Sequence, residues 1–571
     1  MKSISTITSL LIATLVSVGV QADSNPSRVG DFALIDHTGD FHQLSRYGFQ
    51  KALVIFSQSN ACSTIDADIE KLRELRGKWQ DKDVAFMMMN SSATDKLESI
   101  RKTADKKNLD FPILLDESQL VAETLNITKA GEVVILDPTT QNLVYRGPVH
   151  DHIGMALENI IAGKPQQSSM IMEANGCDLA FPAKVAHSKD TPDYVEDVVP
   201  IVKEQCADCH REGGIGPFAM NSYMMMKGWG PMIREVLMTK RMPPMQVDPH
   251  IGHFTNANYI SDQELQTLVH WIDAGAPRGE HKEDPLTAIE HADLRAWQLG
   301  EPDYVVHPPV QDVPATGVID YINEEVVLEF EEDKWVKAVQ FIPGDPAVLH
   351  HLLTYVTGPK EDFDGGESDT RSIARRFLEG YAPGKIDAMT FPKDTGVYIP
   401  KGHKLSMQFH YTTNGKATTD ATILGLYFHD EPPKYEYLNR SVSGRFEVPP
   451  YAQDHEAAAA YTFEEDVLVH GLRAHMHFRG KDMKFSAEFP DGSMKELLSV
   501  PNYSYAWQPT YQLEEPVRLP AGTKVHVTGA FDNSEYNPAN PDPSKTLTFG
   551  LQSWDEMFIG YWSYHPAKPA N

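Results

Sequence analysis

Residues 28 to about 165 alternate short apolar runs with charged, amphipathic stretches. Continuous apolar runs are typical of strands that are buried on both faces of a sheet. The amphipathic stretches 65–79 and 97–107 predict helices, and the run 144–147 predicts an edge strand. The three runs that predict buried strands are 52–56, 84–90 and 132–136. This order predicts an α/β domain, which we place at residues 23–175.

A smaller helical unit is expected at residues 190–280. The stretch 195–205 predicts one helix. A second helix begins at Ser261, which forms a capping box with Glu264, and ends at Gly275. The apolar side chains of this helix share one face: Leu265, Leu268, Val269 and Ile272. The unit is therefore predicted to be a small α-helical domain.

Beyond a polar, proline-containing stretch at 281–315, which predicts a linker, short runs alternate between apolar and polar residues. Alternation of this kind, with turn residues between the runs, predicts antiparallel strands. The clearest runs are 326–330, 338–342, 405–411, 424–428, 467–474, 483–489 and 525–531. We expect two jelly-roll-like β-sandwiches, at residues 316–448 and 455–571, that meet near 449–454.

Length, charge and the N-terminus narrow the function classes. A chain of 571 residues is expected to hold roughly three to five domains. The net charge of −29 argues against nucleic acid or an anionic membrane as a partner. Residues 1–22 have the features of a secretory signal: Lys2, an apolar run at 10–20, and small residues before Asp23. No later run is long enough to span a bilayer, so we expect an exported, soluble protein.

The segment Cys206-x-x-Cys209-His210 predicts one covalently bound haem c. Its two thiols would bond the haem vinyl groups while His210 binds the iron. In bacteria this attachment takes place outside the cytoplasm, so the motif agrees with export and predicts the periplasm. Met242 and Met245, in a proline-rich turn about 30 residues downstream, are candidates for the other axial ligand.

Two cysteines remain outside the haem motif, Cys62 and Cys177. A disulfide is one possibility in an oxidising compartment. Two free thiols are the other, because the sequence does not fix the distance between them. Both alternatives stay open at this point.

The last 220 or so residues contain five histidines and one methionine arranged as a pair, a single residue, a pair and a methionine: His350, His351, His410, His475, His477 and Met557. Imidazole binds copper in both oxidation states, and a thioether favours Cu(I). Residues two apart on a strand point to the same face, so the second pair can bind one ion. The grouping predicts two copper sites, one of three histidines and one of two histidines with a methionine.

The N-terminal domain resembles the thioredoxin-like redoxins, through its Val29-Gly30-Asp31-Phe32 opening and Cys62 after the first core strand. It departs from them at Ile65, where a second cysteine would stand, and at Lys129, where a cis-proline is usual. Two hypotheses follow. The domain is a degenerate structural or docking module, or Cys62 is a redox-active thiol.

The copper-ligand motifs resemble, in the same order, those of the copper type II monooxygenases, the relatives of peptidylglycine α-hydroxylating and dopamine β-monooxygenase. The resemblance runs from roughly residue 310 to 571. It implies that His350, His351 and His410 hold an electron-transfer copper. His475, His477 and Met557 would hold the copper that activates O2. Adjacent histidines normally point to opposite faces, so joint binding by the first pair requires a strand end or a bulge.

The resemblance also covers other residues. Arg473 and Tyr561 match positions that hold the substrate carboxylate in the peptide enzyme, whereas Ile559 replaces an asparagine that assists there. The segment Met242-Pro243-Pro244 resembles cytochrome modules that are fused to such monooxygenases, which implies Met242 as the axial ligand. A small substrate, anionic if Arg473 binds it, is therefore expected, and a peptide is not supported.

These observations predict a periplasmic dicopper monooxygenase that hydroxylates, or oxidises at a heteroatom, a small organic substrate with O2. Electrons from an unknown periplasmic donor would enter through the haem. Two alternatives remain. One is a haem and copper electron-transfer or redox-sensing protein, and the other is a thiol peroxidase or redoxin centred on Cys62.

Overall fold

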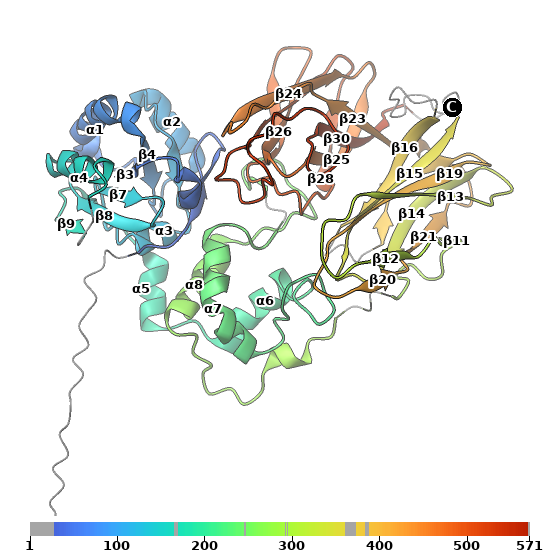
Figure 1. Ribbon diagram of the computed structural model, residues 1–571, viewed down its shortest axis with the longest axis horizontal. Helices are drawn as coiled ribbons and strands as arrows, with labels where there is room; N and C mark the ends of the chain where they lie inside the picture. The colour runs from blue at the N-terminus through green and yellow to red at the C-terminus, as the bar shows by residue number, and fades with distance from the viewer. Residues whose placement is uncertain are drawn as a thin grey trace, which may run out of the picture.

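The computed structural model describes residues 28–164, 169–244, 247–291, 293, 295–359, 373–382 and 388–568. The predicted signal at 1–22 and the methionine at 245 lie outside the described residues. Figure 1 shows an N-terminal α/β domain, a helical unit in green and two β units that include the C-terminal part of the chain. Among the described residues, no helix is both long enough and apolar enough to cross a bilayer.

The N-terminal domain is built on a mixed sheet, as the apolar runs predict. Its elements are β1 (Ala33–Ile35), β2 (Phe41–Gln43), β3 (Ala52–Gln58), α1 (Asp66–Trp79), β4 (Val84–Asn90), α2 (Leu97–Lys107), β5 (Ile113–Leu115), α3 (Leu120–Thr124), β6 (Lys129–Ala130), β7 (Val133–Asp137), β8 (Asn142–Gly147), α4 (His152–Ile161), β9 (Met170–Ile171) and β10 (Cys177–Asp178). The sheet order is β5-β4-β3-β7-β8-β9. The central strand β3 is buried along its whole length. It runs parallel to β4 and antiparallel to β7. The expected thioredoxin-like α/β domain is present.

The helical unit contains α5 (Pro182–Lys189), α6 (Val199–Gln205), α7 (Tyr223–Met238) and α8 (Asp262–Asp273). The capping box of α8 is present, because the Ser261 hydroxyl accepts from the Glu264 N–H at 3.2 Å and the Glu264 carboxylate accepts from the Ser261 N–H at 2.8 Å. The helix predicted at 195–205 is instead a π-helical turn (Tyr194–Val198) followed by α6. Pro200 lies in the first turn of α6, where its missing N–H is tolerated. Helices α3 and α8 share one apolar core, which joins this unit to the N-terminal domain.

The first sandwich packs two sheets around one core. One sheet has the order β11-β21-β14-β18-β22, and β17 pairs with β14; the other has the order β13-β19-β15-β16. Its strands are β11 (Tyr304–Val306), β12 (Gln311–Val313), β13 (Ile322–Val327), β14 (Lys334–Ile342), β15 (Leu349–Pro359), β16 (Ile373–Tyr381), β17 (Met389–Thr390), β18 (Thr395–Ile399), β19 (Lys404–Tyr411), β20 (Thr418–Asp420), β21 (Ile423–Phe428) and β22 (Tyr435–Glu436). The predicted linker at 281–315 therefore contains β11 and β12. These strands are too short for alternation to be visible in the sequence.

The second sandwich has four strands in each sheet, in the orders β23-β30-β25-β28 and β24-β29-β26-β27. Its strands are β23 (Leu438–Ser443), β24 (His455–Thr462), β25 (Val467–Met476), β26 (Gly480–Glu488), β27 (Met494–Val500), β28 (Tyr511–Leu519), β29 (Lys524–Phe531) and β30 (Phe558–Pro566). Because β23 pairs with β30, the two sandwiches meet before β23. The proline-rich stretch at 449–454 connects two sheets of one sandwich.

The chain between α7 and α8 runs along the second sandwich. The Asp248 N–H donates to the Ser499 carbonyl at 3.0 Å, and the Thr255 N–H donates to the Gln512 carbonyl at 2.9 Å. The side chain of Phe254 belongs to the core of that sandwich. The helical unit is thus tied by backbone hydrogen bonds to the domain that carries the predicted O2 site.

Candidate metal centres

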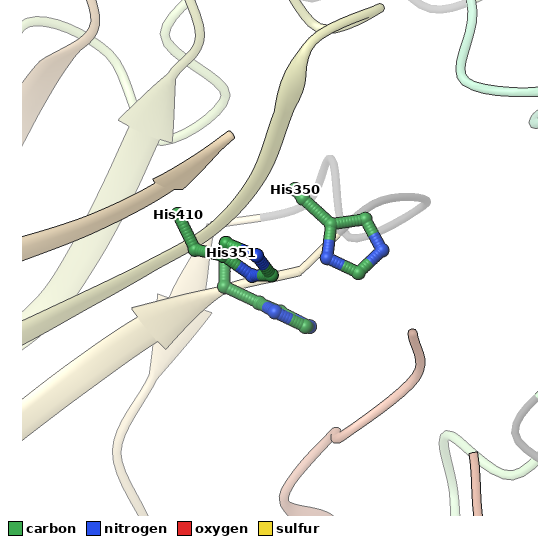
Figure 2. A group of neighbouring side chains, drawn as sticks. All are labelled: His350, His351 and His410. Carbon is green, nitrogen blue, oxygen red and sulfur yellow. The ribbon is translucent and has the colours of Figure 1, made fainter. Parts of the chain in front are cut away.

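Three histidines of the first sandwich converge on one point. His350 and His351 lie on β15 and His410 lies on β19. The pairing steps from Leu349 opposite Tyr411 to His351 opposite His410, so β15 has one extra residue there. This bulge allows adjacent side chains to serve one site. One ring nitrogen from each histidine lies within 4.8 Å of the others, and the rings group together in Figure 2.

These rings are neutral and have free nitrogens. Burial holds the pKa of His350 at about 4 and that of His410 at about 3. The pKa of His351 is lowered further below its usual value by burial and by the neighbouring histidines. Buried nitrogens with no hydrogen-bond partner among the described residues are His350 Nδ1, His351 Nε2 and His410 Nδ1. Orphaned neutral imidazole nitrogens at one point fit a metal ion, and imidazole suits copper.

The second sandwich brings together His475, His477 and Met557, as the sequence predicts. His475 and His477 stand at the end of β25, with ring centroids 5.3 Å apart. Met557 immediately precedes β30, the neighbouring strand, and its Sδ lies 3.3 Å from His475 Nε2. Burial lowers the pKa of His475 to about 3 and that of His477 to about 4. Both imidazoles are therefore neutral at pH 7.

Hydrogen bonds fix the proton on the far side of each ring. His475 Nδ1 donates to the Gln508 side-chain carbonyl at 2.6 Å, and His477 Nδ1 donates to the Asp555 backbone carbonyl at 3.3 Å. Both Nε2 atoms therefore carry lone pairs. A lone pair on His475 then faces the Met557 sulfur, which also has no proton to give. Two acceptors at 3.3 Å gain from a shared cation, and the N–N–S donor set fits copper.

Glu556 holds the second cluster together. Its buried carboxylate accepts from the backbone N–H of His477 at 2.9 Å and from that of Arg479 at 2.7 Å. Burial raises the pKa of Glu556 to about 8. The carboxyl group of Glu556 thus connects the segment after β25, which contains His477, to the segment that contains Met557. The sequence showed Glu556 only as a neighbour of Met557, and no periodicity marks its role.

Arg473 lies between the two sandwiches beside the clusters. Its guanidinium carbon is 4.2 Å from the ring centre of Tyr561 and 4.4 Å from that of Phe377, a residue of the first sandwich. Arg473 and Tyr561 are cross-strand partners. Arg473 is 5% exposed, and its Nε has no hydrogen-bond partner in the described parts of the chain. No ion pair joins Arg473 to a carboxylate among the described residues.

The haem motif follows α6. Cys206 and Cys209 have free, half-buried thiols. The Nδ1–H of His210 donates to the Phe218 carbonyl at 3.0 Å, so Nε2 is left as the lone-pair nitrogen. At Gly216 a Cβ would lie 2.8 Å from His210 Nδ1, so the close approach requires glycine there. These residues fit a covalently bound haem whose iron His210 ligates.

Met242 lies just after α7 and is half-buried; its N–H donates to the Val236 carbonyl at 3.2 Å. No hydrogen bond in the described parts of the chain joins it to His210. The role of Met242 as an axial ligand therefore stays a prediction.

The haem motif lies near Tyr381 of the first sandwich. Burial raises the pKa of Tyr381 above its usual value, and Cys209 and Arg211 lie near enough to influence it. Tyr381 on β16 pairs with Leu352, the residue next to His351. The haem motif therefore lies near β16, the strand that pairs with β15.

Cys62 and Cys177 form a disulfide, with Cα atoms 5.7 Å apart, which decides between the two alternatives left open by the sequence. Cys62 is buried and follows β3, whereas Cys177 is half-buried on β10, which pairs with β6. The Thr64 hydroxyl lies 3.2 Å from the sulfur of Cys62 and 3.7 Å from that of Cys177. The more accessible sulfur is that of Cys177.

Two further contributors to the clusters have weak sequence signals. Gln508 lies in the aromatic stretch 503–508, between the strands β27 and β28. A run of aromatic residues in a loop is a usable signal, because loops seldom keep large apolar side chains without a partner. Ser553, which contacts Tyr505, has no such signal.

Comparison with known proteins supports the N-terminal domain. The sequence model of the AhpC/TSA family matches residues 27–147. A hypothetical protein from Sinorhizobium meliloti 1021 is 23% identical, with a TM-score of 0.25, and the match covers 27% of this chain and 92% of that chain. For peroxidoxin BcpB from Mycobacterium tuberculosis, the identity is 21%, the TM-score is 0.21, and the coverage is 24% and 97%. Residues 27–147 are accordingly a redoxin-like domain of the AhpC/TSA type.

Proposed function

We propose that the two sandwiches form a dicopper monooxygenase that oxidises a small organic substrate with O2. One oxygen atom enters the product and the other leaves as water, while two electrons and two protons are consumed. The observation that carries the proposal is the paired convergence of donors. Three neutral histidines meet in one sandwich, and two neutral histidines meet a thioether in the other. Copper held there supplies one-electron transfer and O2 reduction.

The surrounding residues orient the side chains of the second site. Gln508 and the Asp555 carbonyl hold His475 and His477 in the tautomer that offers Nε2. Glu556 fixes the backbone of the two ligand segments relative to each other. Arg473 presents a buried guanidinium beside the histidines, where it can bind an anionic group of the substrate.

Electrons are proposed to enter through a haem c held by Cys206, Cys209, His210 and Met242. Entry at the three-histidine cluster is supported by Tyr381, which lies near the haem motif on β16, the strand that pairs with β15. The donor is proposed to be a periplasmic redox protein, in agreement with the predicted signal and with the site of covalent haem attachment. The charge of −29 makes a cationic or neutral partner the better fit.

The first prediction concerns this route. When the haem is reduced anaerobically in the full chain with Cu(II) bound, we expect it to reoxidise without any added acceptor. The rate should be independent of protein concentration, because the acceptor lies in the same chain. Stopped-flow absorbance of the haem measures it. A control variant, His351→Ala, should leave the haem reduced, and a wild-type haem that stays reduced for minutes would contradict the route.

Measurements of O2 uptake distinguish a monooxygenase from an electron carrier or redox sensor without oxygenase activity. We expect uptake to rise when small organic acids, amines or sulfur compounds are screened, and the mass of the product to increase by one oxygen atom. A carrier would consume O2 slowly and at the same rate with every compound. The screen therefore also names the substrate class.

The disulfide favours a second candidate function for residues 27–147. A donor dithiol would attack the half-buried Cys177 sulfur and release the Cys62 thiolate, and its second thiol would displace Cys177 and leave an oxidised donor. Cys62 would then reduce a peroxide to an alcohol and become a sulfenic acid. Cys177 would attack this sulfur, release water and restore the disulfide. This scheme is a thiol peroxidase cycle.

The second prediction tests that cycle. Cys62→Ser should abolish peroxide-dependent oxidation of a dithiol, because the attacking thiol is missing. Cys177→Ser should stop after one turnover and leave a sulfenic acid that dimedone traps, which mass spectrometry detects. Substrate-coupled O2 uptake should be unchanged in both variants. Full peroxide reduction by Cys62→Ser would leave the disulfide as a structural crosslink.

A further inference from the structure

The loop between β27 and β28 reaches both ligand clusters. Tyr505 lies between them: its ring centroid is 5.3 Å from that of His410 and 5.8 Å from that of His477. Gln508 of the same loop bonds His475, and the Trp507 ring lies 6.4 Å from that of His350. One short segment of the second sandwich thus contacts histidines of both sandwiches.

The hydroxyl of Tyr505 joins the two sandwiches directly. It hydrogen-bonds the hydroxyl of Tyr321, the residue before β13, and the Ser553 hydroxyl at 2.7 Å. The ring of Tyr321 also packs edge-on against His410, with centroids 5.1 Å apart. Tyr505 is only 9% exposed. Its ring and its hydroxyl are therefore both held by residues of the histidine-bearing surfaces.

Hydrogen bonds attach the loop to the strand that carries His475. The hydroxyl of Tyr503 accepts from the Met476 N–H at 2.9 Å and donates to the Met476 carbonyl at 2.5 Å. Met476 stands between His475 and His477. The loop therefore connects the second cluster, through Tyr503, to the first sandwich, through Tyr505 and Tyr321.

We propose that Tyr505 is a positioning residue that fixes the separation between the two ligand clusters by joining the sandwiches through Tyr321. The inference rests on the proposed function, since a two-site reaction requires an electron to pass from the first cluster to the second. A fixed spacing lets it pass without domain motion. The rate of electron transfer falls as the separation grows, so loss of this connection matters even where all the histidines and Met557 remain.

The test measures the spacing without copper. Nitroxide labels are placed on the full, haem-loaded chain at Lys416→Cys and Lys495→Cys, exposed positions of the first and second sandwich. The haem is kept ferrous so that it does not contribute. Pulsed dipolar EPR should give one narrow distance distribution for the otherwise unchanged chain. Tyr505→Ala should broaden it and shift it to longer distances.

Conservative variants separate the hydroxyl from the ring. Tyr505→Phe and Tyr321→Phe should both broaden the distribution, and the double variant should add nothing, because each removes the hydrogen bond that joins the sandwiches. The bond to Ser553 that Tyr505→Phe also removes lies within the second sandwich. Tyr398→Phe is the matched control: it removes a phenol hydrogen bond to Asp333, within the first sandwich. An unchanged distribution in Tyr505→Ala would overturn the proposal.

The two proposals fail separately. If the distances respond as expected but no compound stimulates O2 uptake, Tyr505 still positions the sandwiches and the monooxygenase proposal falls. If uptake is substrate-coupled but Tyr505→Ala leaves the distances unchanged, the proposal that Tyr505 positions the sandwiches is wrong. With both intact, copper-loaded Tyr505→Phe should show slower intramolecular electron transfer between the clusters, while the two sites keep their copper.

Discussion

His477→Ala is expected to abolish substrate-coupled O2 uptake while the haem spectrum stays unchanged. His477 offers one of three donors at the second cluster, and its Nε2 is buried without another partner among the described residues. With this donor removed, His475 and Met557 alone cannot complete a site, so bound copper should fall from about two ions per chain to about one. Metal analysis, haem absorbance and an oxygen electrode measure the three quantities.

The matched control is His526→Ala. His526 lies on β29 of the same sandwich and pairs with Glu488 at 2.8 Å, away from both clusters. It should keep full copper content and full O2 uptake. Wild-type turnover in His477→Ala would show that the second cluster is not the O2 site.

The sequence predicted the histidine clusters because histidine and methionine side chains have a recognisable metal-binding chemistry. His475 and His477 share a face by simple strand alternation, and the structure places them so. For His350 and His351 to share one site, β15 must contain a bulge, and the local sequence does not predict one. The pairing of β15 with β19 contains this bulge. Alternation reports faces within a strand, whereas a bulge depends on how two strands pair.

What the sequence could not predict are groups that act between distant segments. Gln508, Tyr505 and Tyr321 contact the clusters only after the two sandwiches have packed. Helix α7 was missed for a local reason, since Gly228, Gly230 and Pro231 interrupt its apolar face. The disulfide illustrates the same limit: its two cysteines are 115 residues apart, and only the pairing of β10 with β6 brings them together.

Arg473→Ala is expected to raise KM about 10- to 100-fold for an anionic substrate, because a charged hydrogen bond is worth about 1.5–3 kcal/mol. The guanidinium is buried between Phe377 and Tyr561, and no described carboxylate neutralises it. A buried cation of this kind gains from an anion that enters beside it. Copper content and haem reduction should be unchanged. Steady-state O2 uptake over a range of substrate concentrations gives KM and kcat.

Two further variants separate substrate binding from packing. Arg473→Lys should recover only part of the affinity, because an ammonium cannot make the bidentate contact of a guanidinium. Arg440→Ala is the matched control, since Arg440 also stacks on a tyrosine of the second sandwich, 4.6 Å from the Tyr461 ring centre, away from both clusters. It should lower stability without changing KM. If Arg473→Ala leaves kcat/KM unchanged, the substrate is neutral at this position and Arg473 serves only to join Phe377 of one sandwich to Tyr561 of the other.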